Sequence, residues 1–511
     1  MKKHSKKIFA ALALILALAC ALTACAPAAA SSGNAESRAS EAPASSKADE
    51  KPVTLKYVNH GAKPDTGNCD GIWKAVNEIL LKDLNCTVDV EYLGSGDKAQ
   101  MALKYAGNEK FDFAFTVSWF GFGENALKNA FYEIKQDELE KYAPYMVKTL
   151  SKPAWLACTI SGKLYAVPAI STSWSDQTIA IRGDLREKYG MDPLKTTDDL
   201  EKYLENVAKN ESGVEPCASI LYAVYCNQKY GYRTNGEWAF MVEDPEKGFE
   251  HLAFLDGYLE MAKKSREYVE KGFFSPDLAN DSTTANDKFL NGLSATVFNV
   301  SQTTNNRIAL PLAKSHPEWK VEMFNATAGT KTVKSVESNA FAITRTSEHP
   351  TKVLEVINHI NESVELQKLL CFGVEGVDYE MKDGMLVKLS DVPKEKAFNI
   401  GTNWNMTNKV LWATFYKQEA YEGYDEILAD LEKNSVENIL SVFAFDNSAV
   451  ETEVANISAV QKEFTNGFNY GLFEDVDAKM EEYRQALKDA GYDKVKAEYN
   501  RQAKEFLAAN Q

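Results

Sequence analysis

Thr54-Leu55-Lys56-Tyr57-Val58 and Thr87-Val88-Asp89-Val90-Glu91-Tyr92 are two short segments in which polar and apolar residues alternate. Alternation with a period of two is typical of β-strands. Between them lie residues 59–70, which are rich in Gly, Pro and Asp, and residues 71–84, whose apolar positions have helical spacing. Strand, helix and strand in this order form a βαβ unit with parallel strands. The sequence therefore predicts an α/β fold.

The same alternation of elements continues after the second strand. Residues 97–106 are predicted to form a helix and residues 111–116 a strand, which ends at a loop containing Trp119. Ligands of open α/β sheets bind beyond the carboxyl ends of the strands. The loop that begins at Asn59 and the loop around Trp119 are therefore expected to open onto one crevice.

Later segments predict further α/β structure. The expected elements are a turn and strand at 161–168, helices at 184–189, 197–209 and 245–272, a turn and strand within 289–300, a strand at 340–343, a helix at 350–371 and helices at 476–490 and 493–509. The 511 residues exceed the ~250 at which single cores stop growing. Two lobes or more are expected.

Composition restricts the possible partners. The chain has 45% hydrophobic residues, which is enough for substantial cores, and no second long apolar run follows Val53. With 57 Lys and Arg against 73 Asp and Glu, the net charge is −16, which argues against nucleic acid. The six cysteines after residue 25 form no CxxC pair and give no zinc signature, so free buried thiols are expected, with a Cys217–Cys226 disulfide as the alternative in an oxidising compartment. No metal or cofactor is expected. The six cysteines are Cys69, Cys86, Cys158, Cys217, Cys226 and Cys371.

The first 24 residues have the pattern of an export signal. Four lysines precede the apolar run Ile8 to Ala19, which is too short to span a bilayer. Leu22-Thr23-Ala24-Cys25 resembles a bacterial lipobox, which implies cleavage before Cys25 and a lipid anchor with acyl chains such as palmitate on that residue. Residues 25–52 are too poor in apolar side chains to fold and are predicted to be a tether on the outer face of the cell membrane. The alternative is an ordinary secretory signal with a spare cysteine.

Several motifs, taken in order, resemble a known family. The runs at 107–113, 161–168 and 338–343, with Glu348-His349-Pro350 after the last, are similar to segments of the extracellular solute-binding proteins of ABC importers, in the group with sugar- and oligosaccharide-binding members. Residues 373–379, Asn403-Trp404-Asn405 and the terminal helix pair resemble a subfamily of lipoproteins with a C-terminal domain of unknown function.

The resemblance implies a two-lobed fold of the periplasmic-binding-protein type II class, with hinge crossings and extra C-terminal helices. It divides the chain into lobe 1 at 53–168, lobe 2 at 169–337, a return to lobe 1 at 338–400, and 401–511 as the remainder of lobe 2 with the C-terminal helices. The implied function is capture of a small solute, a carbohydrate by preference, and its delivery to the transmembrane subunits of an ABC permease. The protein would act as a monomer without enzymatic activity.

Sugar sites combine aromatic platforms with polar side chains that bind several hydroxyls. Trp119, Trp174 and Trp404 are the candidate platforms, because each adjoins a strand end, a crossing or a polar segment. The polar candidates lie on the predicted cleft loops and could instead cap helices or fix turns; they are Asn59, His60, Asp65, Asp176, Asn339 and Asn403.

Three other functions remain open. An exported carbohydrate-active enzyme would need two carboxylates across a cleft, but the chain has neither a Gly-x-Ser-x-Gly nor a His-Glu-x-x-His motif. A surface lipoprotein for sensing or adhesion could share the fold, because fold does not determine function. A receptor for peptides is the third.

Overall fold

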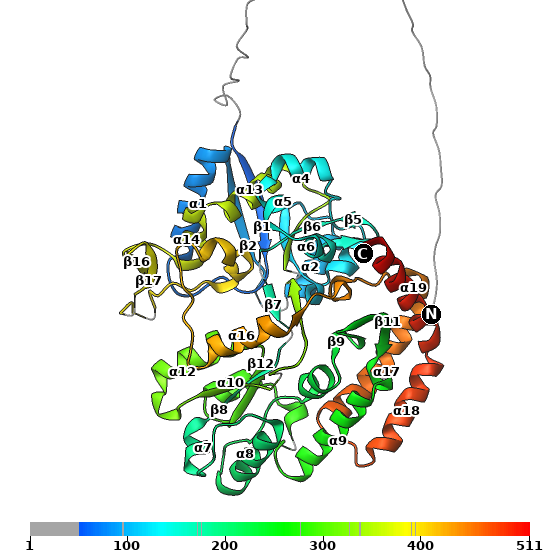
Figure 1. Cartoon of the computed structure of the whole chain (residues 1–511). Coiled ribbons are helices and arrows are strands. Elements are labelled where there is room, and N and C mark those ends of the chain that lie inside the picture. The colour runs from blue at the N-terminus through cyan, green and yellow to red at the C-terminus, as the bar shows by residue number, and fades with distance from the viewer. Residues whose placement is uncertain are drawn as a thin grey trace, which may run out of the picture. The chain divides into compact units, whose positions relative to one another are not determined.

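Figure 1 shows the computed structural model of the chain, which describes residues 51–94, 97–170, 172–174, 176–275, 277–326, 328–336, 339–389, 391–393 and 395–510. The predicted signal segment, Cys25 and the tether up to residue 50 lie outside the described residues.

The first lobe is built on a five-stranded sheet with the order β2-β1-β3-β15-β6. Its strands are β1 (Val53–Asn59), β2 (Cys86–Tyr92), β3 (Phe113–Thr116), β6 (Ala166–Pro168) and β15 (Ala340–Ile343). β1 pairs in parallel with β2 and β3, whereas β15 runs antiparallel between β3 and β6. The predicted βαβ unit is confirmed, with α1 (Cys69–Leu84) as its helix.

The limits of α1 follow from its sequence. The side chain of Asn68 accepts a hydrogen bond from the backbone N–H of Gly71 and so caps the first turn. Asn85 ends the helix in the left-handed conformation, at φ 51°. Between them Trp73, Val76 and Leu80 are buried at helical spacing, which fixes the helix on the sheet.

Further helices cover this lobe. They are α2 (Asp97–Ala106), η1 (Ser118–Phe120), α3 (Phe122–Leu127), α4 (Gln136–Tyr142), α5 (Pro144–Thr149), α6 (Lys152–Ala157), α13 (Pro350–Glu362), α14 (Val364–Phe372), η7 (Gly401–Met406) and α15 (Lys409–Trp412). The helix predicted at 350–371 is interrupted at Ser363, because its side chain accepts from the N–H of Leu366 and starts α14 as a new helix.

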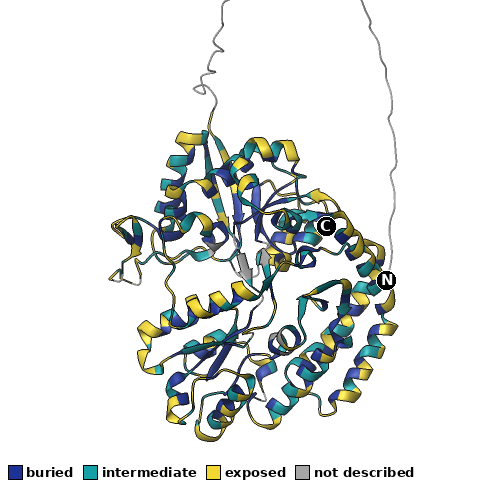
Figure 2. Cartoon of the chain, in the orientation of Figure 1, coloured by how far each residue is buried: buried dark blue, intermediate teal, exposed yellow. Residues whose placement is uncertain are grey.

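The second lobe contains an antiparallel sheet with the order β12-β8-β13, formed by β8 (Thr178–Ile181), β12 (Thr296–Asn299) and β13 (Glu322–Asn325). One hydrophobic core joins its helices to the C-terminal ones, with Tyr203, Tyr258 and Tyr483 fully buried. The helices are α7 (Gly183–Lys188), α8 (Thr197–Asn210), α9 (Asp256–Glu270), α10 (Ala285–Leu290), α12 (Leu310–Ser315), α17 (Glu451–Asn469), α18 (Val476–Asp489) and α19 (Tyr492–Asn510). Figure 2 shows buried residues on the strands and on the inner faces of the helices.

The helix predicted at 245–272 is shorter than expected. α9 begins at Asp256, and residues 244–251 form the strand β11 (Asp244–His251). β11 joins β9 (Tyr232–Asn235) and β10 (Trp238–Met241) in a three-stranded sheet. Gly248 has φ 68°, a conformation outside the helical region, and Phe249 and His251 alternate inward as in a strand.

Three short strands connect the lobes. β7 (Thr172–Trp174), β14 (Thr332–Val336) and β18 (Ser435–Val436) form a sheet with the order β18-β14-β7. The return to the first lobe extends beyond residue 400, because Met406 and Phe415 pack in the core of that lobe. The chain re-enters the second lobe with α16 (Tyr424–Asn434), which contacts β13.

Candidate solute-binding cleft

A large open cavity, here called the main cavity, has a volume of about 990 Å³. Its walls come from η1 and α3 of the first lobe, from the β9–β10 hairpin, and from the C-terminal segment with α17 and α19. Small-molecule sites in proteins occupy ~300–1,000 Å³. The main cavity is therefore large enough for a molecule of several rings.

Trp119 is the exposed aromatic residue of the first lobe at the main cavity, which the buried Phe122 also lines. It lies on η1, directly after β3, and 55% of its surface is exposed. The ring centroids of His60, Phe115 and Phe120 lie 5.8, 5.8 and 5.7 Å from the Trp119 ring. The indole is thus supported from behind while part of it remains free to contact a ligand.

His60 belongs to this support. Its ring lies 4.5 Å from that of Phe115, and its Nδ1 lies 3.5 Å from a carboxylate oxygen of Asp97. Burial lowers the pKa of His60 despite the opposing effect of Asp97. Asp97 also accepts from the N–H of Gly61 at 2.9 Å, so it holds the loop after β1.

The second lobe contributes the β9–β10 hairpin. Trp238 pairs with Asn235, which leaves Gly236 and Glu237 as a two-residue loop. Gly236 has φ 63°, as the first central position of a type II′ turn requires. Arg233, Glu237 and Trp238 of this hairpin line the main cavity.

An aromatic stack stiffens the wall behind the hairpin. The Trp238 ring stacks on the rings of Tyr492 and Tyr499, whose centroids lie 6.0 and 5.0 Å from its own. The Tyr499 ring also stacks on Phe445, with a centroid distance of 4.3 Å. Trp238, Phe445 and Tyr499 all line the main cavity. These residues are far apart in the chain, so their association was not predictable from local sequence.

Among the polar candidates, Asn339 lines the main cavity, whereas Asn59 does not. Asn339 is 7% exposed, and its carbonyl accepts from the N–H of Ala169 at 2.8 Å. Asn59 is fully buried, and its Oδ1 accepts from the Tyr57 hydroxyl at 3.0 Å and from the Asn405 amide at 3.1 Å. Asn59 therefore braces the interior of the first lobe.

Trp174 and Asp176 lie at the crossing between the lobes. The indole N–H of Trp174 donates to Ser435 Oγ at 2.9 Å, which links β7 to β18. The carboxylate of Asp176 accepts from the N–H of Ser301 at 2.7 Å and from the Thr178 hydroxyl at 2.9 Å. Burial raises the pKa of Asp176 to about 6.

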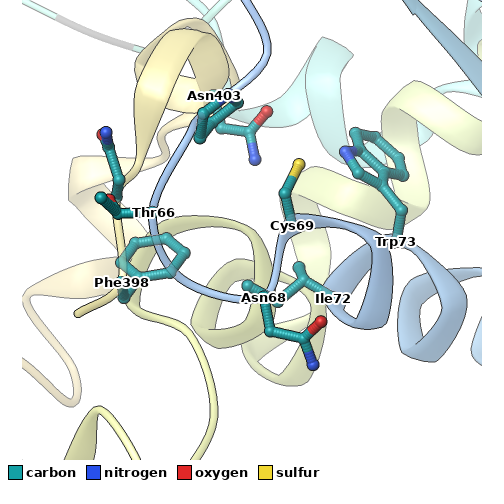
Figure 3. A pocket seen from close by; sticks show the side chains of 9 residues that line it. Thr66, Asn68, Cys69, Ile72, Trp73, Phe398 and Asn403 are labelled. Atoms are coloured by element: carbon teal, nitrogen blue, oxygen red, sulfur yellow. The ribbon is translucent and has the colours of Figure 1, made fainter. Parts of the chain in front are cut away.

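Asn403 lies at a separate small cavity of the first lobe, shown in Figure 3. Thr66, Asn68 and Phe398 also line it, and its volume of about 10 Å³ has room for roughly one water. The Asn403 amide donates to the carbonyl of Leu370 at 3.2 Å. Trp404 is on η7, but its side chain lies outside the described residues, and Asp65 is exposed on the loop before α1.

Sequence reasoning missed the residues of the second lobe and of the C-terminal region at the main cavity. Arg233, Glu237 and Gln461 were not among the candidates, although all three line it. Asn235-Gly236 between two alternating segments is a hairpin signal that could have drawn attention to the first two. Gln461 is one polar residue of an amphipathic helix, and nothing local distinguishes it.

Three observations concern clusters of metal-ligand side chains, the cysteines and the length of the helices. Among the described residues, no His, Cys, Asp and Glu side chains form a group that could hold a metal ion. All six described cysteines are free, and all except Cys69 are buried. The described helices include none with the length and apolar character needed to cross a bilayer.

The two lobes contain separate sheets, three short strands connect them, and residues of both lobes line one large cavity. These features define the class: a two-lobed solute-binding fold of mixed α/β structure. The fold class predicted from the sequence is confirmed.

Comparison with known proteins supports this class. The chain is 26% identical to a carbohydrate ABC transporter substrate-binding protein of Streptococcus pneumoniae serotype 4, over 99% of each chain. Its structure is similar to that of the N-glycan transport solute binding protein (NgtS) of Streptococcus pneumoniae, with a TM-score of 0.70 and 22% identity over 90% of this chain and 100% of that one. The alginate-binding protein AlgQ2 has a TM-score of 0.65 and 18% identity, with coverage of 89% and 98%.

The C-terminal part matches a family model described as a domain of unknown function, DUF3502, at residues 439–508. The resemblance to solute-binding proteins of ABC importers that carry such a domain is thereby confirmed. NgtS has been solved in complex with Man1GlcNAc and with Man5GlcNAc.

Proposed function

We propose that this protein is the extracytoplasmic solute-binding component of an ABC transporter, and that it captures an oligosaccharide in the main cavity for delivery to the membrane permease. The observation that supports it most is the half-exposed indole of Trp119 at a cavity of about 990 Å³ whose other walls carry charged and amide side chains. Aromatic faces suit the apolar C–H faces of sugar rings, and the polar groups suit their hydroxyls. The volume, near the upper end of small-ligand sites, favours several sugar units over one.

Binding in such a cavity can act as a signal. The first lobe supplies Trp119 and the second supplies Arg233 and Glu237, so a solute completes contacts that neither lobe makes alone. A ligand shifts a conformational equilibrium only by its differential affinity for the two states. The form with the lobes closed on the solute is thus stabilised by the solute, and a permease can recognise it by shape.

The test is isothermal calorimetry of residues 51–511 against a panel of neutral oligosaccharides, acidic oligosaccharides and peptides. Saturable binding of an oligosaccharide with one site per chain is expected. Binding of peptides, with no detectable binding of any glycan, would contradict the proposed solute class.

The protein is proposed to bind its solute without transforming it. Glu124 and Glu237 both line the main cavity, which keeps a glycoside hydrolase as the competing hypothesis. Glu124, however, accepts a hydrogen bond from Lys128, whose Nζ lies 2.7 Å from Glu124 Oε1. Incubation with each bound glycan, followed by mass spectrometry of the sugar, separates the two: an unchanged glycan supports a binder, and shortened products would refute it.

Attachment to the outer face of the membrane through Cys25 is part of the proposal. The supporting observation is the lipobox-like Leu22-Thr23-Ala24-Cys25 ahead of a segment poor in apolar residues. Cys25→Ser in the full-length chain is expected to release the protein into the soluble fraction. Retention of the variant in the membrane fraction would argue against the anchor.

A further inference from the structure

Two charged side chains of the β9–β10 hairpin line the main cavity. Within the described part of the chain, neither Arg233 nor Glu237 makes a hydrogen bond or an ion pair through its side chain. Burial lowers the pKa of the Arg233 guanidinium and raises the pKa of the Glu237 carboxyl. A partly buried charge without a partner is unfavourable unless water or a ligand satisfies it.

Glu237 also lies near a second buried polar group. Tyr258 is 1% exposed and its hydroxyl has no hydrogen-bond partner among the described residues. The charge of Glu237 contributes to raising the pKa of Tyr258, although burial is the larger cause. The surroundings of Glu237 therefore have more hydrogen-bonding capacity than the described residues use.

Gln461 is another polar residue that lines the main cavity, and His251 determines the orientation of its amide. His251 is fully buried, and burial lowers its pKa to about 3, so the imidazole is neutral at physiological pH. Its Nδ1 accepts from the N–H of Ala253 at 3.2 Å, hence the single ring proton is on Nε2. That Nε2 lies 2.9 Å from an amide atom of Gln461.

The ring proton on Nε2 requires an acceptor. Which amide atom of a glutamine is oxygen is assigned from its hydrogen bonds, because the two atoms have nearly the same shape. Oε1 of Gln461 must therefore face His251, which leaves the NH₂ group of this cavity-lining residue with no other hydrogen bond among the described residues. The amide of Gln461 is thus a donor to whatever occupies the cavity.

We propose that Arg233, Glu237 and Gln461 form a subsite for an uncharged sugar unit, and that His251 is a positioning residue that presents the NH₂ group of Gln461 to it. This inference rests on the proposed function and deepens it. It also gives a role to the region at 439–508: α17 and α19 form a wall of the solute site.

The charges of the site select an uncharged unit. Arg233 and Gln461 donate to hydroxyl or ring oxygens, and Glu237 accepts from a hydroxyl, so neighbouring hydroxyls satisfy both kinds of group. One positive and one negative charge leave the hairpin neutral. A uronate would bring a carboxylate next to Glu237, where like charges repel.

The first experiment is Gln461→Glu in residues 51–511, measured by calorimetry against the best neutral oligosaccharide. The new carboxylate still accepts the His251 proton but offers the solute no donor, so the Kd should rise about tenfold or more. Gln485→Glu is the matched control, because Gln485 is exposed on α18 and should leave Kd unchanged. An unchanged Kd for Gln461→Glu would overturn the role of Gln461.

Two further measurements do not depend on that variant folding. Nitrogen-15 NMR of the His251 ring should show a protonated Nε2 and an unprotonated Nδ1, and the opposite tautomer would overturn the orientation of Gln461. Arg233→Lys keeps the charge but removes the forked donor, so weaker solute binding with an unchanged melting temperature is expected. Equal affinity of Arg233→Lys and wild type would remove Arg233 from the subsite.

The specificity arm compares wild type with Glu237→Gln on neutral and uronate oligosaccharides of equal length. Wild type should bind the neutral oligosaccharides more tightly than the uronates. In Glu237→Gln the ratio of the two Kd values should be closer to one. Tighter binding of uronates by wild type would overturn the neutral subsite while leaving the proposed function intact. Absence of any glycan binding by wild type would instead refute the proposed function and this inference with it.

Discussion

At the scale of single residues, Trp119 gives the most direct test of the site. Trp119→Ala removes the half-exposed indole and is expected to weaken oligosaccharide binding by about 1–3 kcal/mol, with little change in melting temperature, because the ring is not part of a closed core. Calorimetry measures the loss. Trp319→Ala is the control, since Trp319 stacks on His316 outside the main cavity; equal affinity of wild type and Trp119→Ala would exclude Trp119 from the site.

A second residue-scale prediction concerns pH. Burial raises the pKa of Asp176 from 3.8 to about 6, so between these values the native state binds more protons than the unfolded state. Stability from this group is therefore full below pH ~4 and falls as pH rises to about 6, by about 3 kcal/mol in total.

Asp176→Asn should remove that part of the pH dependence. Relative to wild type, the variant should therefore be more stable at pH 7 than at pH 4. Urea unfolding at both pH values measures the difference from wild type. Asp277→Asn, at an exposed position, is the control. A variant with the same pH dependence as wild type would show that Asp176 does not titrate in this range.

Sequence reasoning at this scale worked where a strand end alone determines position. Trp119 follows β3 directly, so its place at the carboxyl edge of the sheet was predictable. Asn59 also follows a strand end, but it is enclosed by Asn405, a residue 346 positions later in the chain. Nothing local to Asn59 could indicate that partner.

At the scale of elements, one amide joins the C-terminal helix to the hairpin sheet. The N–H of Phe249 donates to Asn500 Oδ1 at 2.6 Å, and the Asn500 amide donates to the Phe249 carbonyl at 2.9 Å. The side chain thus occupies the edge of β11 as another strand would. A Cβ on Gly248 would lie 2.1 Å from the same Oδ1, so this close approach requires glycine.

Asn500→Ala is expected to lower the free energy of unfolding by about 1–3 kcal/mol, because it leaves both backbone groups of Phe249 unpaired in a partly buried place. Chemical denaturation measures the change. Asn210→Ala, which removes an exposed bond on α8, should change stability far less. Similar losses in the two variants would contradict the role given to Asn500.

The element scale also shows why β11 was mistaken for helix. Pro245 fits the first turn of a helix, and the apolar positions from Phe254 onward have helical spacing, but α9 begins only at Asp256. The strand forms because β10 is available to pair with it and because Asn500 covers its free edge. Both partners are contributed by tertiary structure, which a local pattern does not contain.

At the scale of the whole molecule, the order of motifs predicted two lobes and the crossings between them. It did not predict the late exit from the first lobe, because Met406 and Phe415 join that core through contacts with residues far away in the chain. It also left the C-terminal helices without a role. Their contribution to the main cavity depends on how α17 and α19 pack beside the hairpin, which is a property of the assembled lobe.

The whole-molecule prediction is that the solute links closure to stability. A ligand at 100 times its Kd should add about 2.7 kcal/mol to the free energy of unfolding, because it binds only the folded state. The radius of gyration from X-ray scattering should fall at the same concentration, since contacts from both lobes are completed only when the lobes approach. Trp119→Ala is the control for occupancy: at a concentration that saturates wild type but not the variant, the added stability and the fall in radius of gyration should both be smaller. Stabilisation without any change in scattering would mean that the solute binds to one lobe alone, and recognition by the permease would then need another signal.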